Sequence, residues 1–139
     1  MSSADVDGLR FVRERSDLDI AAGEYAYVPA DFRNLIGSVD CLQLDVTRCG
    51  GITGALRVNG LSVAFGLDLS GHCAPQQSAH VLCGVDRLRH LEWFHDHIRI
   101  ESMLFDGVLE PRDGSLVPDR SRAGNGLELK RAEAQRFAA

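Results

Sequence analysis

Four ionisable residues recur at regular intervals along the first two thirds of this chain: Glu24, Asp45, His72 and Glu92. Each stands at or near the end of a short apolar run that is typical of a strand. Their separations of 21, 27 and 20 residues match slightly compact units of a (β/α)8 barrel, which uses about 30 residues per unit. Because parallel strands end at one edge of a sheet, we expect the four side chains to converge on one site.

The four residue types suit acid–base and metal chemistry. A histidine with a carboxylate on one ring nitrogen has a fixed tautomer and raised basicity, so Asp45 and His72 form a candidate general-base dyad. Glu92, in a partly apolar environment, would stay protonated and donate a proton or a hydrogen bond. Glu24 would bind a hard cation such as Mg²⁺, which takes oxygen ligands.

Each residue also has a simpler structural interpretation. Asp45 is placed to cap the helix that Gly50-Gly51 opens, and His72 is of a type often satisfied within a core. Glu92 and Glu24 would then be ordinary surface charges. The regular spacing favours the joint functional interpretation, because chance seldom places an ionisable group at the end of every strand.

Two further kinds of site have weaker signals. Two cysteines and three histidines are residue types that bind zinc: Cys49, His72, Cys73, His95 and His97. Their spacing matches no established zinc pattern. The sequence CGGITG at 49–54 opens a helix after a strand, as phosphate-binding loops do, but it is not G-x-G-x-x-G and no P-loop lysine follows. A tight strand-to-helix turn explains it equally well.

The sequence predicts alternating helices and strands. Helices are expected at 5–15, 29–39, 52–65 and 75–83, and strands at 20–24, 41–46, 67–70 and 88–93. This alternation predicts an α/β fold with a parallel sheet covered by helices. The strand segments lack a clean polar and apolar alternation, as expected for parallel strands buried on both faces. From Ile98 onward, turn signals such as 111–114 and 124–126 predict an irregular, partly β segment, followed by a helix at 129–137.

Composition limits the class of protein. The 139 residues, 45% hydrophobic and 25% charged, are enough for one domain with a core. A net charge of −5 and a pI near 5.4 argue against a nucleic-acid-binding surface. The sequence contains no apolar run of the length of a membrane span or secretory signal, and its four cysteines form no C-x-x-C pair. These features predict a cytoplasmic protein with reduced thiols.

Three segments resemble the branch of the enolase superfamily that includes mandelate racemase and muconate lactonizing enzyme. They are QLDVTRCGGIT around Asp45, SGHCAP around His72 and HLEWFHDHIRIE around Glu92. Residues 104–130 resemble the closing segment of that family's barrel domain, and the segment ending at Glu24 resembles its third metal-ligand strand. The resemblance covers essentially the whole chain.

The resemblance implies a fold and a chemistry. The chain would be the C-terminal half of a modified TIM barrel, with about four βα units at 1–97 and an irregular closing segment with a terminal helix at 98–139. Glu24 would be the third Mg²⁺ ligand, Asp45 and His72 the base dyad, and Glu92 the electrophilic partner of the substrate carboxylate. Members of this branch abstract the proton α to a carboxylate, as Mg²⁺-dependent dehydratases (lyases) or racemases (isomerases), often on acid sugars.

The resemblance also places the capping domain, a catalytic lysine and two metal ligands before Asp5. We therefore expect a fragment that binds Mg²⁺ poorly and is inactive alone. A half barrel exposes two strand edges, so the expected partner is a second copy or a complementing N-terminal half, with a small carboxylate or acid-sugar substrate and no nucleic acid or membrane. The alternatives are a non-catalytic remnant or interaction module of the same fold, or a small phosphate-binding α/β protein.

Overall fold

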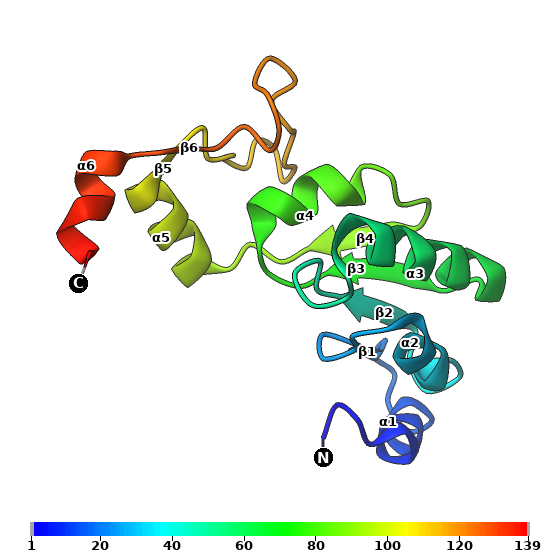
Figure 1. The fold of residues 1–139 in the computed structure, drawn as a ribbon. Helices are drawn as coiled ribbons and strands as arrows, with labels where there is room; N and C mark the ends of the chain where they lie inside the picture. Colours follow the sequence, from blue (N-terminus) through cyan, green and yellow to red (C-terminus); the bar gives the residue numbers. More distant parts are fainter. Residues whose placement is uncertain (1, 139) are drawn as a thin grey trace.

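A four-stranded parallel sheet organises the chain in the computed structural model, which describes residues 2–138. Its strands are β1 (Ala21–Ala22), β2 (Cys41–Leu44), β3 (Asp68–Gly71) and β4 (Leu88–Leu91), and they neighbour one another in chain order (Figure 1). Every pair in the sheet is parallel. The predicted α/β fold with a parallel sheet is therefore confirmed.

The first two helices begin at the expected sequence signals but end earlier than expected. In α1 (Val6–Arg13), the Asp5 side chain accepts a hydrogen bond from the Gly8 backbone at 2.9 Å, which caps the helix. In α2 (Pro29–Leu35), proline occupies the first turn. This helix ends before the expected residue 39, because Gly37 turns the chain with a φ of 84°.

The two longer crossovers carry α3 (Gly51–Phe65) and α4 (Pro75–Leu82). Gly66 follows α3 with a φ of 68° and donates backbone hydrogen bonds to the last turn, as a helix-ending glycine does. Pro75 begins α4, where its missing N–H costs nothing. Both helices match the predicted segments to within a residue.

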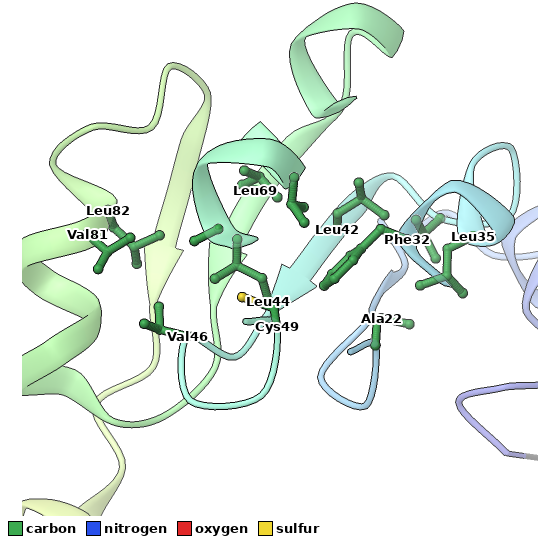
Figure 2. Packing of buried hydrophobic residues seen from close by; sticks show 14 of the residues in the cluster. Ala22, Phe32, Leu35, Leu42, Leu44, Val46, Cys49, Leu69, Val81 and Leu82 are labelled. Atoms are coloured by element: carbon green, nitrogen blue, oxygen red, sulfur yellow. The ribbon is translucent and has the colours of Figure 1, made fainter. Parts of the chain in front are cut away.

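The core lies between the sheet and these helices. Leu42 and Leu44 of β2, Leu69 of β3 and Phe32 of α2 are wholly buried. Figure 2 shows Phe32 beside Leu42, with Leu44 and Leu69 toward the centre of the cluster. Burying each such side chain stabilises the fold by about 1.5–3 kcal/mol, so packing behind the strands holds their ends in place.

The C-terminal third extends away from the sheet (Figure 1). It contains α5 (His95–Leu104), an antiparallel pair of β5 (Phe105–Asp106) and β6 (Glu128–Leu129), α6 (Arg131–Ala134) and a 3₁₀ turn at Gln135–Phe137. The partly β character and the terminal helix were predicted. The expectation of irregular structure from Ile98 was wrong for α5, a helix of which no residue is buried.

The outer strand β4 is open to solvent. Three of its four residues are exposed, and Leu88 retains 43% of its accessible surface. The other sheet strands are more buried, as the predicted pattern requires. Within residues 2–138, every helix is too short or too polar to cross a bilayer.

Candidate active site

The four residues singled out by spacing meet at the C-terminal edge of the sheet. Asp45, His72 and Glu92 each follow directly after the last residue of a strand, and Glu24 lies two residues beyond β1. Two backbone hydrogen bonds extend the strand pairing up to the site: His72 N–H donates to the β2 end at 2.8 Å, and Glu92 N–H donates to the β3 end at 3.0 Å. The side chains are therefore set by the register of the sheet.

His72 is the centre of the cluster. Its Nδ1 donates to Asp45 Oδ2 at 2.9 Å, and its Nε2 lies 2.8 Å from Glu24 Oε2 and 3.9 Å from Glu92 Oε2. An ionised aspartate only accepts hydrogen bonds, so the proton of this pair resides on Nδ1. The other ring nitrogen, Nε2, therefore faces the carboxylate of Glu24.

Asp45 is held as a buried anion. Its Oδ1 accepts from the backbone N–H of Thr47 at 2.8 Å and from the Thr47 hydroxyl at 2.6 Å, and the Arg48 guanidinium lies 3.4 Å from Oδ2. Burial alone would raise the pKa of Asp45. The hydrogen bonds from Thr47 and His72, aided by the Arg48 charge, outweigh it and keep that pKa below its usual range.

Arg48 links this anion to the neighbouring loop. Its guanidinium donates to the Glu24 carbonyl oxygen at 3.2 Å and stacks 4.8 Å from the centre of the Tyr25 ring. The loop that carries Glu24 is thereby tied to the segment that follows Asp45. A single arginine thus stabilises two of the four strand ends.

Glu92 has its own supports. Gln43, two residues before Asp45 on β2, donates from Nε2 to Glu92 Oε1 at 2.8 Å. The Cys73 sulfur lies 3.7 Å from Glu92 Oε2 and 3.3 Å from the His72 Nε2. The side chain of Glu92 is 35% exposed, so it lies at the mouth of the site.

Two glycines allow the strand ends to approach one another. A Cβ on Gly23, whose φ is 134°, would stand 2.5 Å from the carbonyl oxygen of Gln43, so only glycine fits before Glu24. A Cβ on Gly71 would stand 2.5 Å and 2.8 Å from leucine side chains of α4 and β4. This glycine lets the backbone before His72 pack tightly beneath the site.

The segment after His72 has an unusual backbone. Cys73 and Ala74 adopt left-handed φ values of 49° and 41°, which residues with a side chain rarely take. Such residues concentrate at functional sites. Burial, reinforced by the negative charge of Glu92, raises the pKa of Cys73 to about 11, so this thiol stays protonated at neutral pH and does not serve as a nucleophile.

The glycine-rich segment after Asp45 forms a tight turn into α3. Gly50 and Gly51 have φ values of 89° and 66°, and a Cβ on Gly54 would stand 1.7 Å from the carbonyl oxygen of Cys49. These glycines are required by turn geometry and by close packing of the helix on the turn. Turn geometry and close packing are thus sufficient to explain all three glycines, and phosphate binding is not needed to explain them.

The other zinc-type residues do not gather with His72. His95 is exposed, Cys49 is buried behind β2, and His97 accepts a hydrogen bond from the Ala74 backbone at 3.3 Å. The remaining group contains His72, Cys73 and Glu92, whose ligand atoms lie within 4.8 Å of one another. Sequence spacing does not show this group, because Glu92 comes from a different strand.

The residues around Glu24 do not by themselves fit Mg²⁺. Its carboxylate contacts the nitrogen of His72, and the Cys73 sulfur lies just beyond that ring. Mg²⁺ requires near-octahedral oxygen ligands and accepts neither nitrogen nor sulfur readily. Among residues 2–138, this cluster supplies Glu24 and, farther away, Glu92 as oxygen ligands, so we derive no chemical step through the ion.

Sequence reasoning missed three contributors to the site, Gln43, Thr47 and Arg48, and it named Cys73 only as a possible zinc ligand. Gln43 had a usable signal, because residues two apart on a strand face the same way and it precedes Asp45 by two. Thr47 had one as well, since an aspartate commonly accepts from the backbone two residues on. The contacts of Arg48 and Cys73 depend on tertiary placement and had no sequence signal.

Comparisons with known proteins identify the family and similar structures. The family model described as enolase C-terminal domain-like matches residues 1–134. The structure is similar to a mandelate racemase/muconate lactonizing enzyme-like protein from Rubrobacter xylanophilus, with 55% identity and a TM-score of 0.96 over 100% of this chain and 39% of that one.

Two more distant similarities involve ligand-bound structures. An L-talarate dehydratase from Polaromonas sp. JS666, complexed with Mg and L-glucarate, is 29% identical with a TM-score of 0.82, over 97% of this chain and 35% of that one. A Bradyrhizobium enolase, complexed with magnesium and mandelic acid, is 30% identical with a TM-score of 0.86, over 98% of this chain and 37% of that one. The chain thus spans less than two fifths of the length of each of these proteins.

Proposed function

We infer that this chain, which belongs to the enolase C-terminal domain-like family, carries the proton-transfer part of an active site that removes the proton α to a carboxylate. The reaction class is that of a dehydratase or racemase acting on a hydroxy acid or acid sugar. Solved structures similar to it include an L-talarate dehydratase with L-glucarate and an enolase with mandelic acid. Because the chain spans only part of those proteins, the complete enzyme's activity is a proposal.

The dyad of Asp45 and His72 is the observation that carries this proposal. Asp45 holds the proton on Nδ1 through a 2.9 Å hydrogen bond, which directs the other nitrogen, Nε2, toward the mouth of the site. Asp45 also stabilises the imidazolium that forms when Nε2 takes a proton. Nε2, which lies 2.8 Å from Glu24 Oε2, would act as the base.

Glu92 is the proposed partner of the substrate carboxylate. It approaches the same ring nitrogen from a different strand, at 3.9 Å, so a small substrate between them would contact both groups. The hydrogen bond from Gln43 fixes Oε1, and Oε2 has only the long contact of 3.7 Å with the Cys73 sulfur. A protonated Glu92 would donate a hydrogen bond to the oxygen on which negative charge develops.

Magnesium would supply charge neutralisation for the substrate carboxylate in the complete site. Glu24 is the proposed ligand from this chain, with further oxygen ligands from outside the described residues.

Lys130, the only lysine in the sequence, bonds to the Ser102 carbonyl oxygen in the C-terminal region at 2.9 Å. His72 is thus the one proposed base that the described residues contribute.

The open edge of the sheet supports a partner. Leu88 on β4 is 43% exposed and Trp93, just after it, is 39% exposed. Covering such an edge removes unpaired backbone groups and apolar surface from water. We propose that residues 98–139 close the same domain, although the division at 97/98 falls within α5, and that a second copy or an N-terminal half covers β4.

A chimera tests the proposed reaction. Residues 1–139 would replace the matching 39% of the Rubrobacter xylanophilus protein, and α-proton exchange would be followed by NMR in D₂O with Mg²⁺ and a panel of hydroxy acids that includes mandelate and glucarate. We expect exchange in the chimera and its loss, with unchanged circular dichroism, in His72→Asn. Exchange that persists in His72→Asn would remove this histidine from the mechanism.

A further inference from the structure

A nitrogen, a sulfur and a carboxylate oxygen lie within reach of a single cation at the edge of the proposed active site. His72 Nε2 is 3.3 Å from Cys73 Sγ, which is 3.7 Å from Glu92 Oε2. The third separation, between Nε2 and Oε2, is 3.9 Å. These three atoms come from two adjacent strands and enclose a small triangle.

The size of this triangle matches a tetrahedral zinc site. Zinc bonds of about 2.0–2.3 Å to nitrogen, sulfur and oxygen separate neighbouring ligand atoms by about 3.4–3.6 Å. The observed separations differ from those values by only a few tenths of an ångström. Small side-chain rotations would therefore place all three atoms on one ion.

We propose that His72 Nε2, Cys73 Sγ and Glu92 Oε2 form a binding site for a thiophilic divalent cation of the zinc class. These three residues are the group whose ligand atoms lie within 4.8 Å of one another, and solvent would complete the coordination of the ion. The side chains of Glu24 and Glu92 are 31% and 35% exposed, which leaves the ion a path from solvent. This site is distinct from a magnesium site, since nitrogen and sulfur donors select zinc-like ions.

The surroundings of His72 already have the form that zinc sites use. Asp45 accepts from Nδ1, which orients the ring and leaves the Nε2 lone pair for a metal, as in carboxylate–histidine–zinc arrangements. The left-handed backbone of Cys73 places a 4% exposed residue beside that nitrogen. The Ser78 hydroxyl fixes this turn by donating to the Cys73 carbonyl oxygen at 2.9 Å.

Cation binding would occupy the nitrogen that the proposed mechanism needs as a base. That consequence rests on the proposed function, whereas the binding site rests on the three ligand atoms alone. The two are therefore tested separately. Metal binding is measured on the 139-residue chain, and proton exchange is measured on the chimera.

Binding of the cation would displace the thiol proton of Cys73 to solvent. Cobalt titration of the full chain tests the site, because the resulting thiolate ligand gives Co²⁺ a charge-transfer band in the near ultraviolet. We expect this band at one Co²⁺ per chain, its loss on adding Zn²⁺ and its persistence in excess Mg²⁺. Cys73→Ser should abolish the band and weaken Zn²⁺ binding at least about tenfold. The matched control is Cys83→Ser, because that thiol is free and exposed, and it should change neither.

Two results would overturn the proposal: no thiolate band in the unsubstituted chain, or a band that survives Cys73→Ser. If Cys73→Ser does not fold, Glu92→Gln provides a second test. With an unchanged circular dichroism spectrum, it should weaken Zn²⁺ binding at least about tenfold by isothermal calorimetry. Unchanged affinity in that variant would equally exclude the site.

Discussion

Thr47 donates two hydrogen bonds to one oxygen of Asp45, from its backbone at 2.8 Å and its hydroxyl at 2.6 Å. The second oxygen of Asp45 is thereby left to His72. The two hydrogen bonds from Thr47 occupy Oδ1, and His72 bonds to Oδ2. Thr47 also shares the cost of burying the charge, since a buried carboxylate needs several donors to stay ionised.

Removing the Thr47 hydroxyl should destabilise the ionised form of Asp45. The pKa of Asp45 is lowered in the folded chain, so its stabilising contribution is present above the unfolded value of about 4 and is lost as pH falls through the folded value. Thr47→Val moves the folded pKa upward. We expect about 1.5–3 kcal/mol less stability at pH 7 by urea unfolding, and a smaller difference near pH 3.

Thr47→Ser is the matched control for this prediction, because it retains the hydroxyl. Its free energy of unfolding should be close to that of the unsubstituted protein at both pH values. A valine variant as stable as the serine variant at pH 7 would show that the hydroxyl contributes nothing to the anion.

Asp45→Asn should uncouple the dyad while leaving its shape. An amide in this position no longer fixes the tautomer or stabilises the imidazolium, so α-proton exchange in the chimera should fall about 10²- to 10⁴-fold. NMR in D₂O measures the exchange. Asp68→Asn is the control: this aspartate pairs with Arg87 and Arg89 at the opposite end of β3, so its loss should leave exchange near the parent rate.

Two glycines of α3 should respond in opposite directions to alanine. A Cβ at Gly54 would stand 1.7 Å from the Cys49 carbonyl oxygen, whereas a Cβ at Gly60 meets nothing within 4 Å. Gly54→Ala should destabilise the protein by about 3 kcal/mol or more, because the turn must move. Gly60→Ala should stabilise it by about 0.5–1 kcal/mol. Thermal unfolding compares the two, and equal effects would contradict the close contact.

Glu101 offers a gain in stability. Burial raises the pKa of this carboxyl, and its Oε2 has no hydrogen-bond partner. A raised folded pKa means that stability is present below the unfolded value of about 4.3 and is lost as pH rises through the folded value. Glu101→Gln keeps the shape without the charge, so its Tm should exceed the parent Tm at pH 7.

The pH dependence separates this effect from a general one. At pH 3.5 the parent and Glu101→Gln should unfold at similar temperatures, because both side chains are then neutral. Glu128→Gln, on a side chain 80% exposed, should change the Tm little at either pH. A Tm for Glu101→Gln below that of the parent at pH 7 would contradict the burial argument.

The ends of the helices and strands can be predicted from the sequence because turn signals and apolar runs are local. Gly66 and Pro75 mark helix ends through their own backbone preferences, and both stand where expected. Residues that follow strands of one parallel sheet then lie together by topology alone. The prediction that Asp45, His72 and Glu92 would converge needed only this rule.

The remaining contacts depend on tertiary structure. The Gln43–Glu92 hydrogen bond joins residues 49 apart in the sequence, and the register of the intervening strand decides whether they meet. The position of Cys73 depends on a left-handed backbone that its residue type does not favour. No residue of α5 is buried, so packing against the core does not mark this helix in the sequence.

Each strand of the sheet delivers one residue to the cluster, so the cluster reports on completion of folding. An intermediate that lacks β4 has no Glu92 opposite His72, and one that lacks β1 has no Glu24 on the other side. A one-residue slip of β3 would turn His72 away from both. The proposed arrangement around this histidine therefore requires all four strands to be paired in register.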